Sequence, residues 1–217
     1  PNVHDFVWAA DPGFKHVSKK IRKGLTIHLL YKTTNAPEKG WLNILDQLTR
    51  ALPFIEKTFG PYPYRQYSFI HGGDGGMEYP MATLLKSPSG WNHEFMHSWY
   101  QGMMGTNELE YPWMDEGFAQ YAGARVWGYL NGDTSVEQTY GREYDAYISF
   151  AKSNLQEPMT TYADYFNSNS TSSIITDKNA PKISFSPRIN IRLNFDESNN
   201  IALGYAEYYM MQNFSAL

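Results

Sequence analysis

The sequence predicts an α+β fold, in which a small N-terminal sheet is followed by a mostly helical part. Residues 25–31 alternate apolar with more polar side chains, which is typical of a half-buried β-strand. Residues 41–59 place apolar side chains at helical spacing, from Trp41 through Leu48 to Phe59. Because strand-like segments come first and helical segments later, we expect the two kinds of element to be segregated.

Further strands and helices are expected at several places along the chain. Residues 66–71 read as a short strand that ends in a glycine-rich loop over residues 72–76. The last apolar run, residues 201–217, is helix-like. Helical stretches are also expected over residues 91–104, 111–130 and 135–154, and a strand is expected near residues 189–195.

Composition excludes several classes of partner. The 217 residues carry a formal net charge of −4 without long runs of one sign, so we expect no nucleic acid and no anionic membrane surface as partners. No apolar stretch approaches the roughly 20 residues that span a bilayer, so we expect no membrane-spanning segment. The chain has no cysteine, which leaves any metal site to histidine and carboxylate ligands. We expect a periplasmic or secreted protein, with a cytoplasmic location as the alternative, and the oligomeric state is left open.

The run His93-Glu94-Phe95-Met96-His97 carries the main chemical signal. Two histidines four residues apart on a helix project from one face and can bind one ion together. Eighteen residues separate His97 from Glu116, which lies on the next expected helix and supplies a third ligand. Two imidazoles and one carboxylate leave a fourth position open for water, which is typical of a catalytic zinc site. We therefore expect one Zn²⁺ per chain, with Glu94 as the general base.

A second candidate motif lies upstream, at Gly75-Gly76-Met77-Glu78. The glycines allow the backbone to approach an extended peptide, and the Glu78 carboxylate can pair with the free α-ammonium group of a substrate. Such pairing would make the protein an exopeptidase, whereas the alternative is that Glu78 is a solvated loop acid. A phosphate-binding loop is excluded because the Lys and the Ser or Thr that it needs do not follow.

These motifs resemble the gluzincin aminopeptidases of the membrane-alanyl-aminopeptidase type, a family that includes the bifunctional leukotriene hydrolase. The resemblance covers roughly residues 1–167. It implies a thermolysin-like zinc metallopeptidase catalytic domain that removes amino-terminal residues from peptide substrates. The motifs that carry it are His93-Glu94-x-x-His97-x-Trp99, Asn107, Pro112-Trp113-Met114-Asp115-Glu116-Gly117-Phe118, Gly75-Gly76-Met77-Glu78 and Phe59-Gly60-Pro61-Tyr62-Pro63-Tyr64.

The sequence departs from the family pattern at two places. The family usually has Asn after the glutamate that corresponds to Glu78, and this chain has Tyr79. The family also carries a Tyr that donates a hydrogen bond to the oxyanion. Its usual spacing falls at residues 173–181, which contain no Tyr, so we take Tyr205 as the candidate catalytic substitute.

Domain organisation and two alternative functions follow from the same patterns. Because the chain opens on Pro1 and ends in an apolar run, we expect a piece of a longer protein. Residues 1–30 would be the end of a preceding β-rich domain or a linker, and residues 31–217 a partial catalytic domain. The alternatives are a zinc endopeptidase, in which Glu78 points away from the cleft, and a non-catalytic zinc-retaining module that binds peptides. Asp115 either orients a metal ligand or caps a helix.

Overall fold

The computed structural model describes residues 3, 5–34, 36–73, 75–133, 145–153, 155, 157–158 and 160–167, and the backbone of residues 186–193 and 201–208. Contacts divide the chain into two units, Pro1–Ala180 and Pro181–Leu217. The first unit contains a five-stranded sheet with helices, and the second contains a two-stranded hairpin. The expected boundary at residues 30 and 31 stays a prediction.

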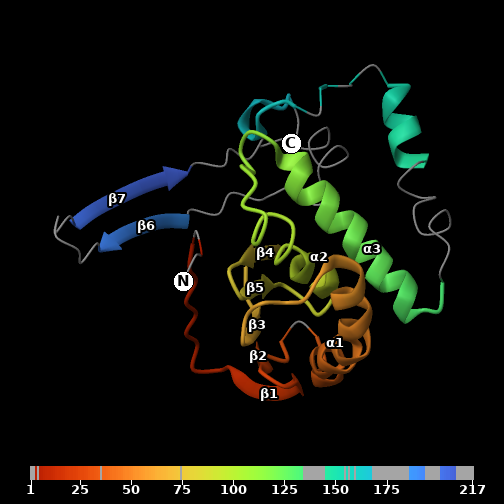
Figure 1. Cartoon of the computed structure of the whole chain (residues 1–217), viewed down its shortest axis with the longest axis vertical. Helices are drawn as coiled ribbons and strands as arrows, with labels where there is room; N and C mark the ends of the chain where they lie inside the picture. The colour runs from red at the N-terminus through yellow and green to blue at the C-terminus, as the bar shows by residue number, and fades with distance from the viewer. Residues whose placement is uncertain are drawn as a thin grey trace. The chain divides into compact units, whose positions relative to one another are not determined.

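The sheet of the first unit is mixed, with the strand order β1-β2-β3-β5-β4 (Figure 1). Neighbours β2 and β3 are parallel, as are β3 and β5, whereas the outer pairs β1–β2 and β4–β5 are antiparallel. Together with the helices, this sheet makes the α+β class that the sequence predicts. The strands are β1 (Lys15–Arg22), β2 (Leu25–Tyr31), β3 (Gln66–His71), β4 (Gly76–Tyr79) and β5 (Ala82–Leu85).

Helix α1 (Glu38–Phe59) lies between β2 and β3 in the chain, so the elements are less segregated than the sequence suggested. The parallel pairing of β2 with β3 requires such a crossover connection. The alternate residues Leu25, Ile27 and Leu29 of β2 are fully buried, as the alternation predicts. On α1 the buried residues at helical spacing are Trp41, Ile44, Leu45, Leu48, Ala51, Leu52 and Ile55.

Strands β1, β4 and β5 were not expected from the sequence. Strand β1 is rich in lysine, and its Lys15 and Lys19 form ion pairs with Glu38 and Asp46 of α1, at 3.2 and 3.0 Å. Strand β4 is short and begins at Gly76, within what the sequence indicated as a glycine-rich loop. Polar or glycine-containing strands of this kind lack the apolar alternation on which a sequence-based prediction depends.

The helix expected over residues 91–104 is shorter in the structure, where α2 spans only Trp91–Met96. Residues beyond it form turns, and Gly102 N–H donates to the His97 carbonyl at 2.9 Å. Gln101 has a φ of 81°, which no α-helix accommodates. A β-carbon at position 102 would lie 2.9 Å from the His97 carbonyl oxygen, so the turn requires glycine there.

The helix expected over residues 111–130 is divided into a π-helical turn, η1 (Trp113–Gly117), and α3 (Phe118–Leu130). The third expected helix is described only in part, as a helical segment over residues 145–151 that is followed by the 3₁₀ turn η2 (Ala163–Tyr165). Among the described residues, no helix is both long and apolar enough to cross a bilayer.

The second unit is an antiparallel hairpin of β6 (Ser186–Leu193) and β7 (Ile201–Tyr208). The strand expected near residues 189–195 is confirmed within β6. The helix-like interpretation of residues 201–217 is wrong for Ile201–Tyr208, because pairing with β6 decides their conformation and an apolar run does not reveal that pairing. Residues 209–217 lie outside the described part of the chain.

Helices α2 and α3 meet at a glycine. A β-carbon at Gly123 of α3 would lie 3.1 Å from the His93 Cα and 3.3 Å from the His93 nitrogen. These are backbone atoms of α2, which cannot move without moving the helix. The absence of a side chain at Gly123 therefore sets how closely α3 approaches α2.

We expect Gly123→Ala to force α2 and α3 apart and to lower the free energy of unfolding by about 1–3 kcal/mol. Chemical denaturation of the full chain measures this. Gly117→Ala is the matched control, because a β-carbon at Gly117, where α3 begins, meets no atom within 4 Å. Equal stability of the two variants would contradict the close contact between the helices.

Candidate metal centre

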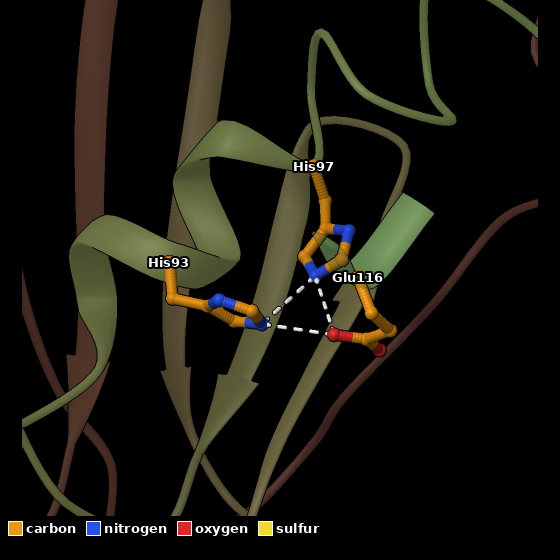
Figure 2. A group of neighbouring side chains, drawn as sticks. All are labelled: His93, His97 and Glu116. Atoms are coloured by element: carbon orange, nitrogen blue, oxygen red, sulfur yellow. Dashed lines mark hydrogen bonds and ion pairs between the residues drawn. The ribbon is translucent and has the colours of Figure 1, made fainter. Parts of the chain in front are cut away.

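Three side chains from two helical segments converge on one point (Figure 2). His93 Nε2 lies 3.1 Å from His97 Nε2 and 3.2 Å from Glu116 Oε2. The remaining separation, between His97 Nε2 and Glu116 Oε2, is 3.7 Å. The three residues that the sequence predicts as metal ligands therefore present one atom each to a common centre.

The spacing of these three atoms fits a zinc ion. Zinc bonds to imidazole nitrogen and carboxylate oxygen are about 2.0–2.2 Å long, so tetrahedral geometry separates the ligand atoms by about 3.4 Å. The observed separations of 3.1, 3.2 and 3.7 Å bracket that value. Two nitrogens and one oxygen also match the donor set of catalytic zinc sites.

Local structure explains why these residues meet. His93 and His97 are four residues apart along α2 and its C-cap, and therefore share one face. Glu116 comes from η1, where the π-helical turn changes the direction of successive side chains. Such turns are frequent at functional sites. Because of this turn, the adjacent residues Asp115 and Glu116 both reach His97, from opposite sides of its ring.

Asp115 fixes the orientation of His97. Its carboxylate accepts a hydrogen bond from His97 Nδ1 at 2.6 Å, and both side chains are buried. With Nδ1 carrying the proton, the neutral ring presents the Nε2 lone pair to the centre. This contact answers the question that the sequence left open, since Asp115 orients a candidate ligand and no side-chain cap bond is present at the start of η1.

His93 is positioned differently. Within the described residues its Nδ1 is buried without a hydrogen-bond partner, so the contacts that orient the ring are those of Nε2 at the centre itself. The backbone of His93 instead packs against Gly123 of α3. Sequence analysis missed this role of Gly123, because a glycine inside a helix carries no sign of what it contacts.

Two further carboxylates adjoin the centre. Atoms of Glu78, Glu94 and His97 that could bind a metal all lie within 4.8 Å of one another. Glu94 is buried, and its carboxylate lies against Gly76 so closely that a β-carbon there would overlap it. The absence of a side chain at Gly76 thus leaves room for the Glu94 carboxylate. The sequence suggested only that this glycine binds substrate, and did not reveal its contact with Glu94.

The remaining residues of the upstream motif hold strand β4 in place. The Gly75 carbonyl accepts a hydrogen bond from Lys86 N–H at 2.8 Å, and the Met77 carbonyl accepts one from Thr83 Oγ1 at 2.9 Å. Both bonds tie β4 to the strand beside it. Tyr205 lies on β7 opposite Ile189, and its side chain is outside the described part of the structure, so its catalytic role stays a prediction.

The electrostatics of the centre call for a positive charge. Burial raises the pKa of Glu78 well above its usual range, and the neighbouring carboxylates of Asp115 and Glu116 add to that effect against the opposing influence of His97. Burial alone would lower the pKa of His97, but the carboxylates around it raise that pKa well above its usual value. An excess of buried acids around two imidazoles is what a divalent cation would neutralise.

Comparison with known proteins identifies the fold. No protein-family model matches the chain, and no curated protein matches it in sequence. Among solved structures, the M1 zinc metallopeptidase from Deinococcus radiodurans is similar with a TM-score of 0.53 and 19% identity, over 73% of this chain and 37% of that chain. The fold is that of M1 zinc metallopeptidases.

Two related structures agree with this fold. A mutant of the Deinococcus radiodurans enzyme bound to a Tyr-Ser-Ala substrate gives a TM-score of 0.50 at 18% identity, over 73% of this chain and 37% of that one. A two-domain M1 zinc metallopeptidase mutant bound to L-tryptophan gives 0.51 at 18% identity, with the same coverage. The chain spans 37% of the length of these proteins. The predicted α+β fold is confirmed, whereas the thermolysin-like domain and the aminopeptidase subtype stay predictions.

Replacing Asp115 tests its contact with His97. Because partners that orient metal-binding histidines contribute about 10–100-fold to metal affinity, we expect Asp115→Ala to weaken zinc binding by that factor. Asp115→Asn keeps a hydrogen-bond acceptor but loses the charge, so its zinc affinity should lie between those of the wild type and Asp115→Ala. Zinc affinity is measured by competition with a chelator, and Asp46→Asn on α1 is the control. Unchanged affinity in Asp115→Ala would contradict the orienting role.

Proposed function

We propose that this chain is the zinc-binding catalytic core of an aminopeptidase with a thermolysin-like catalytic domain. The observation that carries the proposal is the triangle of His93, His97 and Glu116 atoms, with Glu94 and Glu78 beside it. The M1 metallopeptidase fold supports the same class of reaction. We propose one Zn²⁺ per chain, held by these three residues.

Zinc at this centre would supply Lewis-acid chemistry, lowering the pKa of water towards neutrality and polarising a peptide carbonyl. Glu94 has the position of a general base, because it lies next to His93 in sequence and its carboxylate is within 4.8 Å of His97 without belonging to the ligand triangle. A Glu94 oxygen takes a proton from the attacking water and later delivers it to the leaving amine.

Glu78 supports cleavage at the amino terminus. Its carboxylate lies within 4.8 Å of both Glu94 and His97, so it faces the centre. A carboxylate there pairs with the α-ammonium group of a bound peptide and limits the enzyme to the first peptide bond. The endopeptidase alternative requires Glu78 to point away, and its observed direction favours the aminopeptidase.

Stabilisation of the oxyanion requires a hydrogen-bond donor opposite the metal. We keep Tyr205 as the proposed donor, on the basis of the Tyr that the family carries and residues 173–181 lack. The non-catalytic module that retains zinc and binds peptides remains the second candidate for this reason. Zinc at one per chain without hydrolysis of a diverse peptide panel would favour it over an enzyme.

Glu94→Gln separates catalysis from metal binding. The amide cannot accept and return a proton, so we expect turnover of free-amino peptides to fall by about 10²–10⁴-fold while zinc content stays unchanged. Turnover and metal content are measured on the same preparations of full-length chain. If the variant retained wild-type turnover, Glu94 would not be the general base.

Glu78→Gln tests recognition of the amino terminus. Loss of the charge-assisted contact should raise KM for free-amino peptides by about 10-fold or more, because bonds to charged groups contribute about 1.5–3 kcal/mol. The readout is hydrolysis of paired peptides with free and N-acetylated ends. We expect the wild type to cleave only the free form, and equal cleavage of both forms would exclude an aminopeptidase.

A further inference from the structure

Two adjacent side chains at the start of α2 connect it to two other helices. Trp91 Nε1 donates a hydrogen bond to Gln47 Oε1 of α1 at 2.8 Å. Asn92 Nδ2 donates one to the Gly123 carbonyl of α3 at 2.7 Å. Helix α2 has only six residues, and no side chain caps its start. Because a helix of this length is not stable by itself in water, its position depends on these bonds and on the packing around them.

The bond from Asn92 lies where α2 packs against α3 (Figure 1). The backbone of the next residue, His93, lies against the same glycine, since a β-carbon at Gly123 would be 3.1 Å from the His93 Cα. Packing against a glycine sets how closely two helices approach, but it does not fix their relative rotation. A hydrogen bond adds that constraint, because it weakens steeply as its angle departs from linear.

The Gly123 carbonyl can accept this bond although it lies inside a helix. A carbonyl oxygen has two lone pairs, so it can accept the bond within α3 and a second one from Asn92. The distance of 2.7 Å is at the short end of the range for N–H···O bonds, and the contact is partly buried. Asn92 therefore adds a directional contact between the helices without removing one from α3.

This contact also affects the separation between His93 and Glu116. Glu116 lies on η1, which continues directly into α3, so Glu116 and Gly123 belong to one helical segment. Gly123 comes seven residues after Glu116, which is about two helical turns, and both residues face α2. Fixing α2 against Gly123 therefore fixes His93 relative to Glu116, whose Oε2 lies 3.2 Å from His93 Nε2.

The two histidines of the centre differ in what holds them. The Asp115 carboxylate accepts a hydrogen bond from the His97 ring. Within the described part of the chain, the buried Nδ1 of His93 has no such partner. The place of the His93 ring therefore depends on the backbone of α2, and Asn92 is the adjacent residue on that backbone.

We propose that Asn92 is a positioning residue for the metal centre, and that its bond to the Gly123 carbonyl keeps His93 at the distance from Glu116 that zinc requires. The inference rests on the proposed function in one respect, namely that the centre binds zinc. Asn92 acts through the backbone of α2, whereas Asp115 acts directly on the ring of His97.

The experiment is a double-mutant cycle on zinc affinity, measured on the full chain by competition with chelators of graded strength. Asn92→Leu removes the donor at similar volume, and we expect zinc affinity to fall about 10-fold, the lower end of the effect of partners that orient metal ligands. In a His93→Gln background the same substitution should change zinc affinity less than twofold, because the ligand that Asn92 positions is absent. Asn92→Ala replaces Asn92→Leu in the cycle if circular dichroism shows that the leucine variant does not fold.

Tyr62→Phe is the control for a general loss of stability. The Tyr62 hydroxyl donates to the Gln66 carbonyl at 2.9 Å, and phenylalanine loses that bond but keeps the ring. Its zinc affinity should stay within twofold of the wild type. Unchanged affinity in Asn92→Leu, or a 10-fold loss that persists in the His93→Gln background, would overturn the positioning role.

Failure of the proposed function gives a different result. A wild type that binds zinc but hydrolyses no peptide excludes the aminopeptidase, while the affinity cycle supports or overturns the role of Asn92 as before. A wild type that binds no zinc overturns both proposals.

Discussion

The structure depends on one electrostatic constraint, namely that two imidazoles, one buried and one partly buried, face a common point together with several carboxylates. His97 Nε2 lies within 3.7 Å of both His93 Nε2 and Glu116 Oε2, and all three atoms can act as acceptors. Such atoms repel one another unless a cation or protons lie between them. The spacing matches zinc, and the Asp115 carboxylate holds His97 in the tautomer that zinc requires.

The fold meets this constraint through close contacts that only glycine permits. Gly123 lets α3 approach the backbone of His93, Gly76 leaves room for the Glu94 carboxylate, and Gly102 allows the chain to turn after His97. Each of these glycines lies directly against a residue of the centre, namely His93, Glu94 or His97. The positions of the side chains at the centre therefore depend on the packing of the helices and strand β4 around it as much as on the ligands themselves.

The sequence could predict the parts of this structure that depend on local periodicity and motif spacing. The alternation in β2 and the helical spacing in α1 identify the core, and the spacing of the two histidines on α2 leads to a shared metal. Other features depend on tertiary contacts. Strand β7 exists because it pairs with β6, and the π-helical turn that brings Asp115 to His97 has no periodic pattern of its own.

The most direct test of the account is X-ray absorption at the zinc edge, on the full chain loaded with one equivalent of zinc. We predict one tightly bound ion per chain with two imidazole nitrogens and a carboxylate oxygen at about 2.0–2.2 Å, and loss of one nitrogen in His93→Gln. A chain that retains no zinc after dialysis, or a coordination shell that His93→Gln leaves unchanged, would contradict the metal centre.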